Sequence, residues 1–234
     1  MLWSLGMTGV VAVSAQVLPT LLAGRELPLP IWAMGAISLV QSGVYLLIAV
    51  LIGCNLGPQV GLGAPILAGT QPLNSRATGR MLAEALSVGA GCGLLLHALG
   101  TVAPEGIRTL GERLHVPLLS RVLYGGFTEE VLIRWGLMTF VLWVLVRLAK
   151  RRAVGHGVRV GAAIAVSAFL FGLGHLPVVA AMAEALTAPV VLYVLAGNFG
   201  FGVVFGYLYF RRGIESAMVA HALAHVVAVA VSGI

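Results

Sequence analysis

Residues 118–148, LLSRVLYGGFTEEVLIRWGLMTFVLWVLVRL, form the stretch that decides the fold of this chain. The run is mostly apolar and is long enough to cross a bilayer, for which about 20 residues suffice. Two adjacent glutamates and an arginine lie inside it, Glu129, Glu130 and Arg134. A charge near the middle of a membrane costs at least ~2.5–3.5 kcal/mol on insertion scales, so such residues usually mark a functional site.

The composition of the whole chain is that of an integral membrane protein. Of the 234 residues, 59% are hydrophobic and 9% are charged, and the mean hydropathy is +1.02. A soluble domain with one core does not have this profile. The formal net charge of +6 does not indicate a nucleic-acid partner, because the basic residues fall between apolar runs and form no basic stripe.

Seven apolar runs predict seven membrane-spanning helices, at about 20 residues for each span. They cover residues 2–23, 31–54, 81–103, 118–148, 159–180, 186–210 and 214–232. The connectors between them carry helix-breaking proline and glycine. We therefore expect an all-α, polytopic helical bundle that forms one domain over residues 1–234, a multi-pass protein of the cell (inner) membrane, surrounded by lipid.

The distribution of basic residues predicts the orientation of the bundle. The connectors before the third, fifth and seventh runs carry the most, namely Arg76, Arg80, Lys150, Arg151, Arg152, Arg159, Arg211 and Arg212. The opposing connectors carry fewer, namely Arg25, Arg108 and Arg113. Because cytoplasmic loops hold an excess of Lys and Arg, we expect the N-terminus inside and the C-terminus outside.

Three of the runs carry ionisable residues at similar depth. Glu129 lies about eight residues from the start of the fourth run, His175 about five from the end of the fifth, and His225 about seven from the end of the seventh. At 1.5 Å per residue, each lies roughly 7–12 Å below the same membrane face, since the fourth run is antiparallel to the other two. The sequence therefore predicts that these side chains share one layer.

Helical spacing separates the two glutamates of the fourth run. Glu130 and Arg134 are four residues apart, so they can form an ion pair on one face of the helix. Glu129 lies about 140° from Arg134 on an α-helix and is left free to face a cavity. A carboxylate in that position suits a general base. The ion pair alone also has a purely structural interpretation.

The histidines supply the other groups that hydrolysis needs. His221 and His225 are four residues apart and project from one face, where neutral imidazoles can donate hydrogen bonds to an oxyanion or bind a metal. His175 can share a water molecule with Glu129. These groups predict hydrolysis of an amide within or beside the membrane. Asn198 either bonds to the backbone or lines the cavity, and His97 fits a packing role.

Two other functions remain open on these residues. A proton- or ion-coupled transporter also uses intramembrane Glu, His and Arg, although the chain has no inverted repeat and no paired broken helices. A catalytically silent immunity or scaffold protein is the third possibility.

The chain resembles the CPBP intramembrane proteases, which include the CAAX prenyl endopeptidases of the Ras-converting type and bacterial Abi or bacteriocin-processing proteins. Three motifs carry the resemblance: EExxxR at residues 129–134, FxxxH at residues 171–175, and HxxxN or HxxxD at residues 221–225. The likeness covers residues 118–232 well and the first hundred residues only generally.

The resemblance implies a helical membrane protease with a cavity open to one face. Carried over to this sequence, it implies that Glu129 and His175 activate water, that His221 and His225 stabilise the oxyanion, and that Glu130 and Arg134 support the site. Phe171 and Asn198 are expected to line the cavity. The expected substrate is a membrane-anchored or lipidated protein or peptide. With the orientation above, the site lies nearer the outer face, which favours a substrate trimmed after translocation.

The third motif departs from the family pattern, because His225 stands where the family usually has Asn or Asp. A neutral imidazole still donates a hydrogen bond. Three histidines and a glutamate also make a plausible zinc shell, with Glu129, His175, His221 and His225 as ligands. We favour a metal-free glutamate mechanism with no cofactor, since no HExxH helix is present, and zinc is the alternative.

Overall fold

The computed structural model describes residues 1–24, 26–148, 155–183 and 185–233, which contain helices and no strand. The helices are α1 (Leu2–Gln16), α2 (Leu18–Leu22), α3 (Ile31–Leu56), η1 (Gly57–Val60), α4 (Arg76–Thr101), α5 (Glu105–Leu114), α6 (Leu118–Ser120), η2 (Arg121–Met138), α7 (Thr139–Leu148), α8 (His156–Met182), α9 (Ala188–Arg212) and α10 (Ile214–Ser232). The segments α6, η2 and α7 form one continuous helix, Leu118–Leu148.

The predicted helical membrane bundle is confirmed. In the described part of the chain, six helices are long and apolar enough to cross a membrane. The run at residues 2–23 differs from the prediction, because α1 has only 15 residues and gives way to the short helix α2. Pro19 lies in the first turn of α2, where its missing N–H removes a hydrogen bond that one continuous helix would need.

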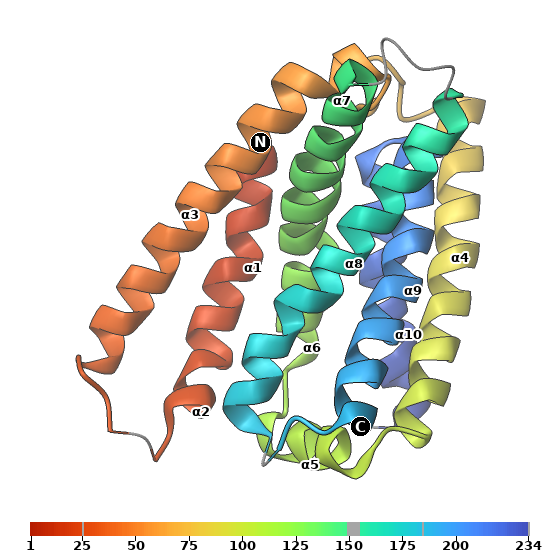
Figure 1. Cartoon of the computed structure of the whole chain (residues 1–234). Coiled ribbons are helices and arrows are strands. Elements are labelled where there is room, and N and C mark those ends of the chain that lie inside the picture. The colour runs from red at the N-terminus through yellow and green to blue at the C-terminus, as the bar shows by residue number, and fades with distance from the viewer. Residues whose placement is uncertain (25, 149–154, 184, 234) are drawn as a thin grey trace.

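The helices run back and forth between two ends of an elongated bundle (Figure 1). The N-terminus, the α3–α4 connector and the α9–α10 turn lie at one end, and α5 and the C-terminus lie at the other. The first end therefore carries the described basic residues Arg76, Arg80, Arg147, Arg159, Arg211 and Arg212. Arg25, Lys150, Arg151 and Arg152 lie outside the described residues. Which end faces the cytoplasm stays a prediction.

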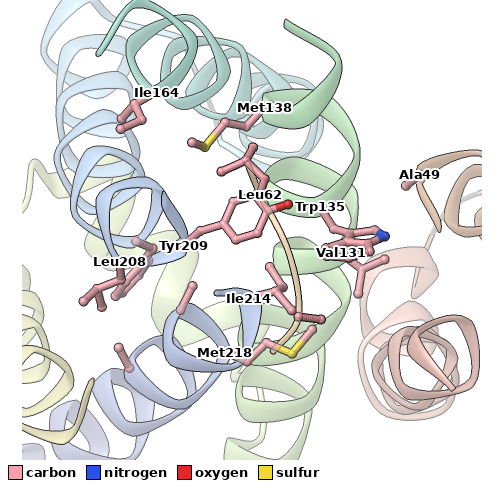
Figure 2. Close-up of a cluster of buried hydrophobic side chains, with 14 of the residues drawn as sticks. Ala49, Leu62, Val131, Trp135, Met138, Ile164, Leu208, Tyr209, Ile214 and Met218 are labelled. Atoms are coloured by element: carbon pink, nitrogen blue, oxygen red, sulfur yellow. The ribbon is translucent and has the colours of Figure 1, made fainter. Parts of the chain in front are cut away.

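A core of large apolar side chains joins η2, α9 and α10 near the basic end (Figure 2). Trp135, Tyr209 and Ile214 are buried there together with Leu62 from the α3–α4 connector. The Tyr209 and Thr139 hydroxyls lie 2.9 Å apart in a buried hydrogen bond. This packing fixes the start of α10, the helix that carries two of the predicted site histidines.

Glu215 fastens the α3–α4 connector to the first turn of α10. Its Oε1 accepts hydrogen bonds from the backbone N–H groups of Ile66 and Leu67, each at 2.9 Å. The Ile214 N–H donates to the carbonyl of Gly63 at 3.1 Å. These contacts join residues far apart in the sequence. They fix how α10 is rotated about its own axis and how far it is shifted along the bundle.

Candidate active site

The segment that carries both glutamates, η2, is a π-helix rather than the expected α-helix. In a π-helix each N–H bonds to the carbonyl five residues earlier, so a turn is wider than the 3.6 residues of an α-helix. The predicted angle of about 140° between Glu129 and Arg134 assumed α-helical turns, which η2 does not have, but Glu130 still pairs with Arg134 and Glu129 still faces a cavity. The segment contains Gly125, Gly126 and Gly136, which weaken its α-helical preference.

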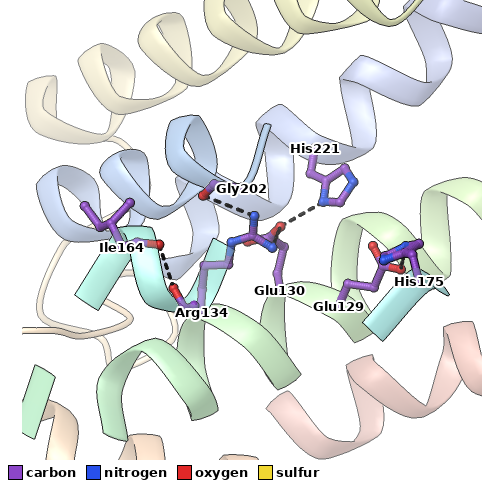
Figure 3. Close-up of polar contacts among 8 residues, drawn as sticks. Glu129, Glu130, Arg134, Ile164, His175, Gly202 and His221 are labelled. Carbon is purple, nitrogen blue, oxygen red and sulfur yellow. Dashed lines mark hydrogen bonds and ion pairs between the residues drawn. The ribbon is translucent and has the colours of Figure 1, made fainter. Parts of the chain in front are cut away.

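Glu130 and Arg134 form the predicted ion pair in the interior of the bundle (Figure 3). Glu130 is 0% exposed, and its Oε1 lies 3.1 Å from the Arg134 Nη1. The Arg134 guanidinium lies between the rings of Phe171 and Phe205, 5.1 and 5.7 Å from their centroids. Its Nη2 donates to the Gly202 carbonyl at 3.4 Å. Arg134 therefore neutralises Glu130 and ties η2 to α8 and α9.

Glu130 also orients His221. The His221 Nδ1 lies 2.8 Å from the Glu130 Oε1. Because an ionised carboxylate only accepts hydrogen bonds, the Nδ1 carries the proton and donates it. The Nε2 of a neutral His221 then carries a lone pair and no proton, so it can only accept. His221 can donate a hydrogen bond from Nε2 only when the ring is protonated at both nitrogens, as an imidazolium. The expectation that a neutral His221 donates to an oxyanion does not fit this arrangement.

Glu129 and His175 face each other from η2 and α8 (Figure 3). The Glu129 Oε1 lies 3.7 Å from the His175 Nε2, too far for a direct hydrogen bond, and the side chains are 15% and 37% exposed. The His175 Nδ1 lies 2.9 Å from the Phe171 carbonyl, which can only accept, so the Nε2 of the neutral ring is an acceptor. Two acceptors at this separation can take both protons of one water molecule.

One cavity of about 240 Å³ brings the predicted site residues together. Its lining includes Glu129, His175, His221, His225, Phe171 and Asn198. The Asn198 amide also donates to the Val194 carbonyl at 2.8 Å, so both interpretations of that residue apply. Sequence reasoning missed Arg121 and Tyr124, which line the cavity from the same helix as Glu129. Both residues lie in the helical turns that precede Glu129, and this position could have indicated that they line the same cavity.

Three rings stack along one wall of the cavity. Phe205 and His221 have centroids 4.5 Å apart, and His221 and His225 have centroids 5.0 Å apart. Gly125 of η2 faces the two histidines. A β-carbon at Gly125 would lie 2.5 Å from the His225 Nε2 and 3.2 Å from the His221 Nε2. The absence of a side chain at Gly125 therefore lets both imidazoles approach η2.

Gly125→Ala is expected to lower kcat for the reaction at this site by about 10²-fold. The added methyl group would push the imidazoles of His221 and His225 away from η2, and a displacement of about 1 Å is enough to misalign catalytic groups with the reacting atoms. Gly91→Ala is the matched control, since a β-carbon at Gly91 meets no atom within 4 Å. The measurement is kcat and the unfolding temperature of both variants in detergent. Equal kcat values for the two variants would show that the imidazole positions do not matter.

The alternative zinc shell consists of Glu129, His175, His221 and His225, which all line the cavity. Within the described ranges, no group of three or more His, Cys, Asp or Glu side chains converges closely enough to hold a metal ion. The Nδ1 atoms of His221 and His175 are engaged by protein acceptors, which leaves both Nε2 atoms free, as in histidines that bind a metal through Nε2. The metal-free mechanism therefore stays a prediction, with zinc as its alternative.

Comparison with known proteins identifies the family. Residues 112–227 match the family model of the Rce1-like type II CAAX prenyl endopeptidases. The matched segment contains all three motifs and the four residues Glu129, His175, His221 and His225. No curated protein and no solved structure matches the chain. Together with the three motifs, this match places the chain in the CPBP/CAAX protease family.

Proposed function

We propose that Glu129 and His175 activate the water molecule with which this membrane-embedded protease hydrolyses a peptide bond of a membrane-associated substrate. The family supports a CAAX-type intramembrane endopeptidase in general. The assignment of the two residues is supported by one observation, the 3.7 Å approach of the Glu129 Oε1 to the His175 Nε2 inside the cavity. Both atoms are hydrogen-bond acceptors that a single water molecule satisfies together.

In the proposed mechanism, the water oxygen attacks the carbonyl carbon of the substrate as Glu129 takes a proton from the water. His221, held by Glu130 and donating from Nε2 as an imidazolium, stabilises the oxyanion together with His225. The C–N bond then breaks, and the proton on Glu129 passes to the leaving nitrogen. The second water proton stays on the new carboxylic acid and is released when that acid ionises, so the products are a carboxylate, an amine and a proton, and no redox partner is required.

The Glu130–Arg134 pair contributes by positioning. Its carboxylate fixes the protonated nitrogen and the ring orientation of His221, in the way that a buried acid orients a histidine base. Removal of this acceptor would free the ring to rotate. The pair itself does not line the cavity and has no direct contact with the substrate in this mechanism.

The side of the membrane from which the substrate comes follows from the orientation. The cavity extends toward the end of the bundle that holds α5, because its lining includes Val116, Ser120 and Arg121. The basic connectors lie at the opposite end. If the basic end is cytoplasmic, the site opens toward the outer face, and the substrate is an exported or membrane-anchored protein. The reverse orientation would favour a peptide or lipidated protein on the cytosolic side.

The purified full-length chain in lipid vesicles tests the proposal. A library of peptides with an N-terminal acyl anchor is added, and mass spectrometry detects new carboxyl and amino ends. Cleavage that is lost in both Glu129→Ala and His175→Ala supports the mechanism, and cleavage retained in both refutes it. Electrogenic ion uptake without cleavage would favour a transporter, and neither activity would favour a silent scaffold.

Metal removal separates the two mechanistic schemes. Because Glu129 and His175 suffice to polarise the water, we expect peptide cleavage to be unchanged after prolonged treatment with a chelator and extensive dialysis. The measurement is kcat before and after treatment, with zinc added back to a parallel sample. Loss of activity that zinc restores would contradict the metal-free mechanism.

A further inference from the structure

The outward face of α3 carries a heptad pattern that packing within the bundle does not use. Exposed residues recur along the helix at alternating spacings of four and three, namely Ile37, Gln41, Val44, Ile48, Leu51 and Asn55. This spacing places the side chains in one stripe, along which two helices can pack as a left-handed coiled coil. We call these residues the α3 seam. Its two polar members, Gln41 and Asn55, occupy the same heptad position.

The opposite face of α3 is fixed against α1 and η2. The Trp3 indole N–H of α1 donates to the Gly43 carbonyl at 2.9 Å. Gly53 lies directly against the Trp135 indole of η2, with no room for a β-carbon. Leu46, between these two glycines, is fully buried. These contacts fix the rotation of α3, so the seam points away from the bundle, of which α3 forms an outer edge (Figure 1).

Gln41 places an amide on the lipid-facing side of α3 near the middle of the membrane. It lies ten residues after the start of the helix, about 15 Å into a hydrocarbon layer about 30 Å thick. In the described part of the chain, its side chain makes one hydrogen bond, from Nε2 to the Tyr45 hydroxyl at 3.0 Å. A carboxamide has two N–H groups and an oxygen with two lone pairs, so most of its capacity remains. Lipid tails cannot satisfy these groups, whereas the apolar seam residues need no partner.

A second copy of the chain has the chemistry that complements this amide. Two copies share one membrane topology, so their α3 helices run parallel, and a two-fold axis between them brings each seam residue beside its own counterpart. A carboxamide both donates and accepts, so Gln41 can pair with Gln41, and the same register pairs Asn55 with Asn55. The seam contains no charged residue that would repel its copy.

We propose that the α3 seam is the interface of a parallel homodimer in the membrane. Gln41 and Asn55 set the register, and the aliphatic residues Val44, Ile48 and Leu51 pack between them. The α3 helix lies outside residues 112–227, which match the family model, and within the described ranges it supplies no residue to the cavity lining. The inference therefore does not depend on the proposed function.

Cysteine cross-linking of the full-length protein in lipid vesicles tests the geometry. The Cys54→Ser background removes the exposed native thiol. In that background Val44→Cys places a thiol on the seam, and Val40→Cys places one on the same exposed surface but outside the seam. Because a disulfide needs Cα atoms within about 7 Å, mild oxidation should link Val44→Cys into a dimer and leave Val40→Cys monomeric. Equal cross-linking of the two variants would show random collision and would overturn the inference.

Single-molecule photobleaching at decreasing protein-to-lipid ratios tests the role of the amide. Gln41→Leu should weaken self-association by about 3- to 30-fold, the loss expected for an interhelical hydrogen bond in lipid. Ser87→Leu is the control, because it also removes an exposed polar group but lies on α4, at the other outer edge of the bundle. This variant should associate like the wild type, and both variants should keep the wild-type unfolding temperature in detergent.

Two results of the photobleaching experiment would overturn the inference. One is a wild type that stays monomeric at every protein-to-lipid ratio, because lipid or a different protein would then cover the seam. The other is a Gln41→Leu variant that associates as tightly as the wild type. Both experiments use only the purified protein and lipid, so their outcome is independent of peptide cleavage.

Discussion

Glu129→Gln is expected to reduce kcat for peptide hydrolysis by about 10²–10⁴-fold and to leave the fold unchanged. Glutamine has nearly the same shape as glutamate but cannot accept the proton that the attacking water must lose. Glu129 is partly exposed to the cavity, and its nearest ionic partner in the described part of the chain, His175, lies beyond direct hydrogen-bond distance, so the substitution breaks no buried hydrogen bond. The measurement is kcat under single-turnover conditions, together with the unfolding temperature in detergent.

Glu84→Gln is the matched control for this prediction. Glu84 pairs with Arg212 at 2.6 Å at the basic end of the bundle, away from the cavity. The same change of carboxylate to amide at that position should leave kcat close to the wild-type value. If Glu129→Gln kept most of the wild-type kcat, Glu129 would not be the general base.

Arg134→Met is expected to destabilise the protein by about 3–5 kcal/mol, because it leaves the carboxylate of Glu130 buried without its counter-charge. Glu130 is fully buried, so water cannot compensate for the lost partner. The substitution also removes the cation from between Phe171 and Phe205. The measurement is the free energy of unfolding in mixed micelles, with Arg147→Met as the control, since Arg147 is exposed near the other end of the same helix.

The double variant Glu130→Gln/Arg134→Met separates the stability of the ion pair from its role in the site. Replacing both members of a buried pair is often nearly neutral, so the double variant should recover most of the lost stability. Its kcat should stay low, because His221 no longer donates to a carboxylate. A double variant as unstable as the single one, or a stable Arg134→Met, would contradict the assigned role of the pair.

The sequence was sufficient to predict the bundle and the Glu130–Arg134 pair, for identifiable physical reasons. Long apolar runs require spanning helices, and the boundaries of the later helices lie close to those predicted. Glu130 and Arg134 are close in sequence, so local helical geometry brings them together whether the turns are α-helical or wider. The shared depth of Glu129, His175 and His225 likewise followed from counting residues along antiparallel helices.

The remaining features depend on contacts between distant parts of the chain. His221 meets Glu130 across 91 positions of sequence, and that contact needs the rotation of α10 about its own axis. Apolar periodicity cannot give this rotation, because lipid-facing and buried faces are both apolar in a membrane bundle. The π-helical turns of η2 also lack a distinctive sequence pattern, whereas Pro19 was an available signal for the break between α1 and α2.

Hydrolysis in ¹⁸O-labelled water tests the central claim most directly. The protein is held in excess over a cleaved peptide so that each molecule turns over once, and the new carboxylate is examined by mass spectrometry. If Glu129 and His175 activate a water molecule for direct attack, every new carboxylate carries one ¹⁸O atom in the first turnover. A first-turnover product without ¹⁸O would mean that a protein oxygen was transferred, and it would contradict the mechanism.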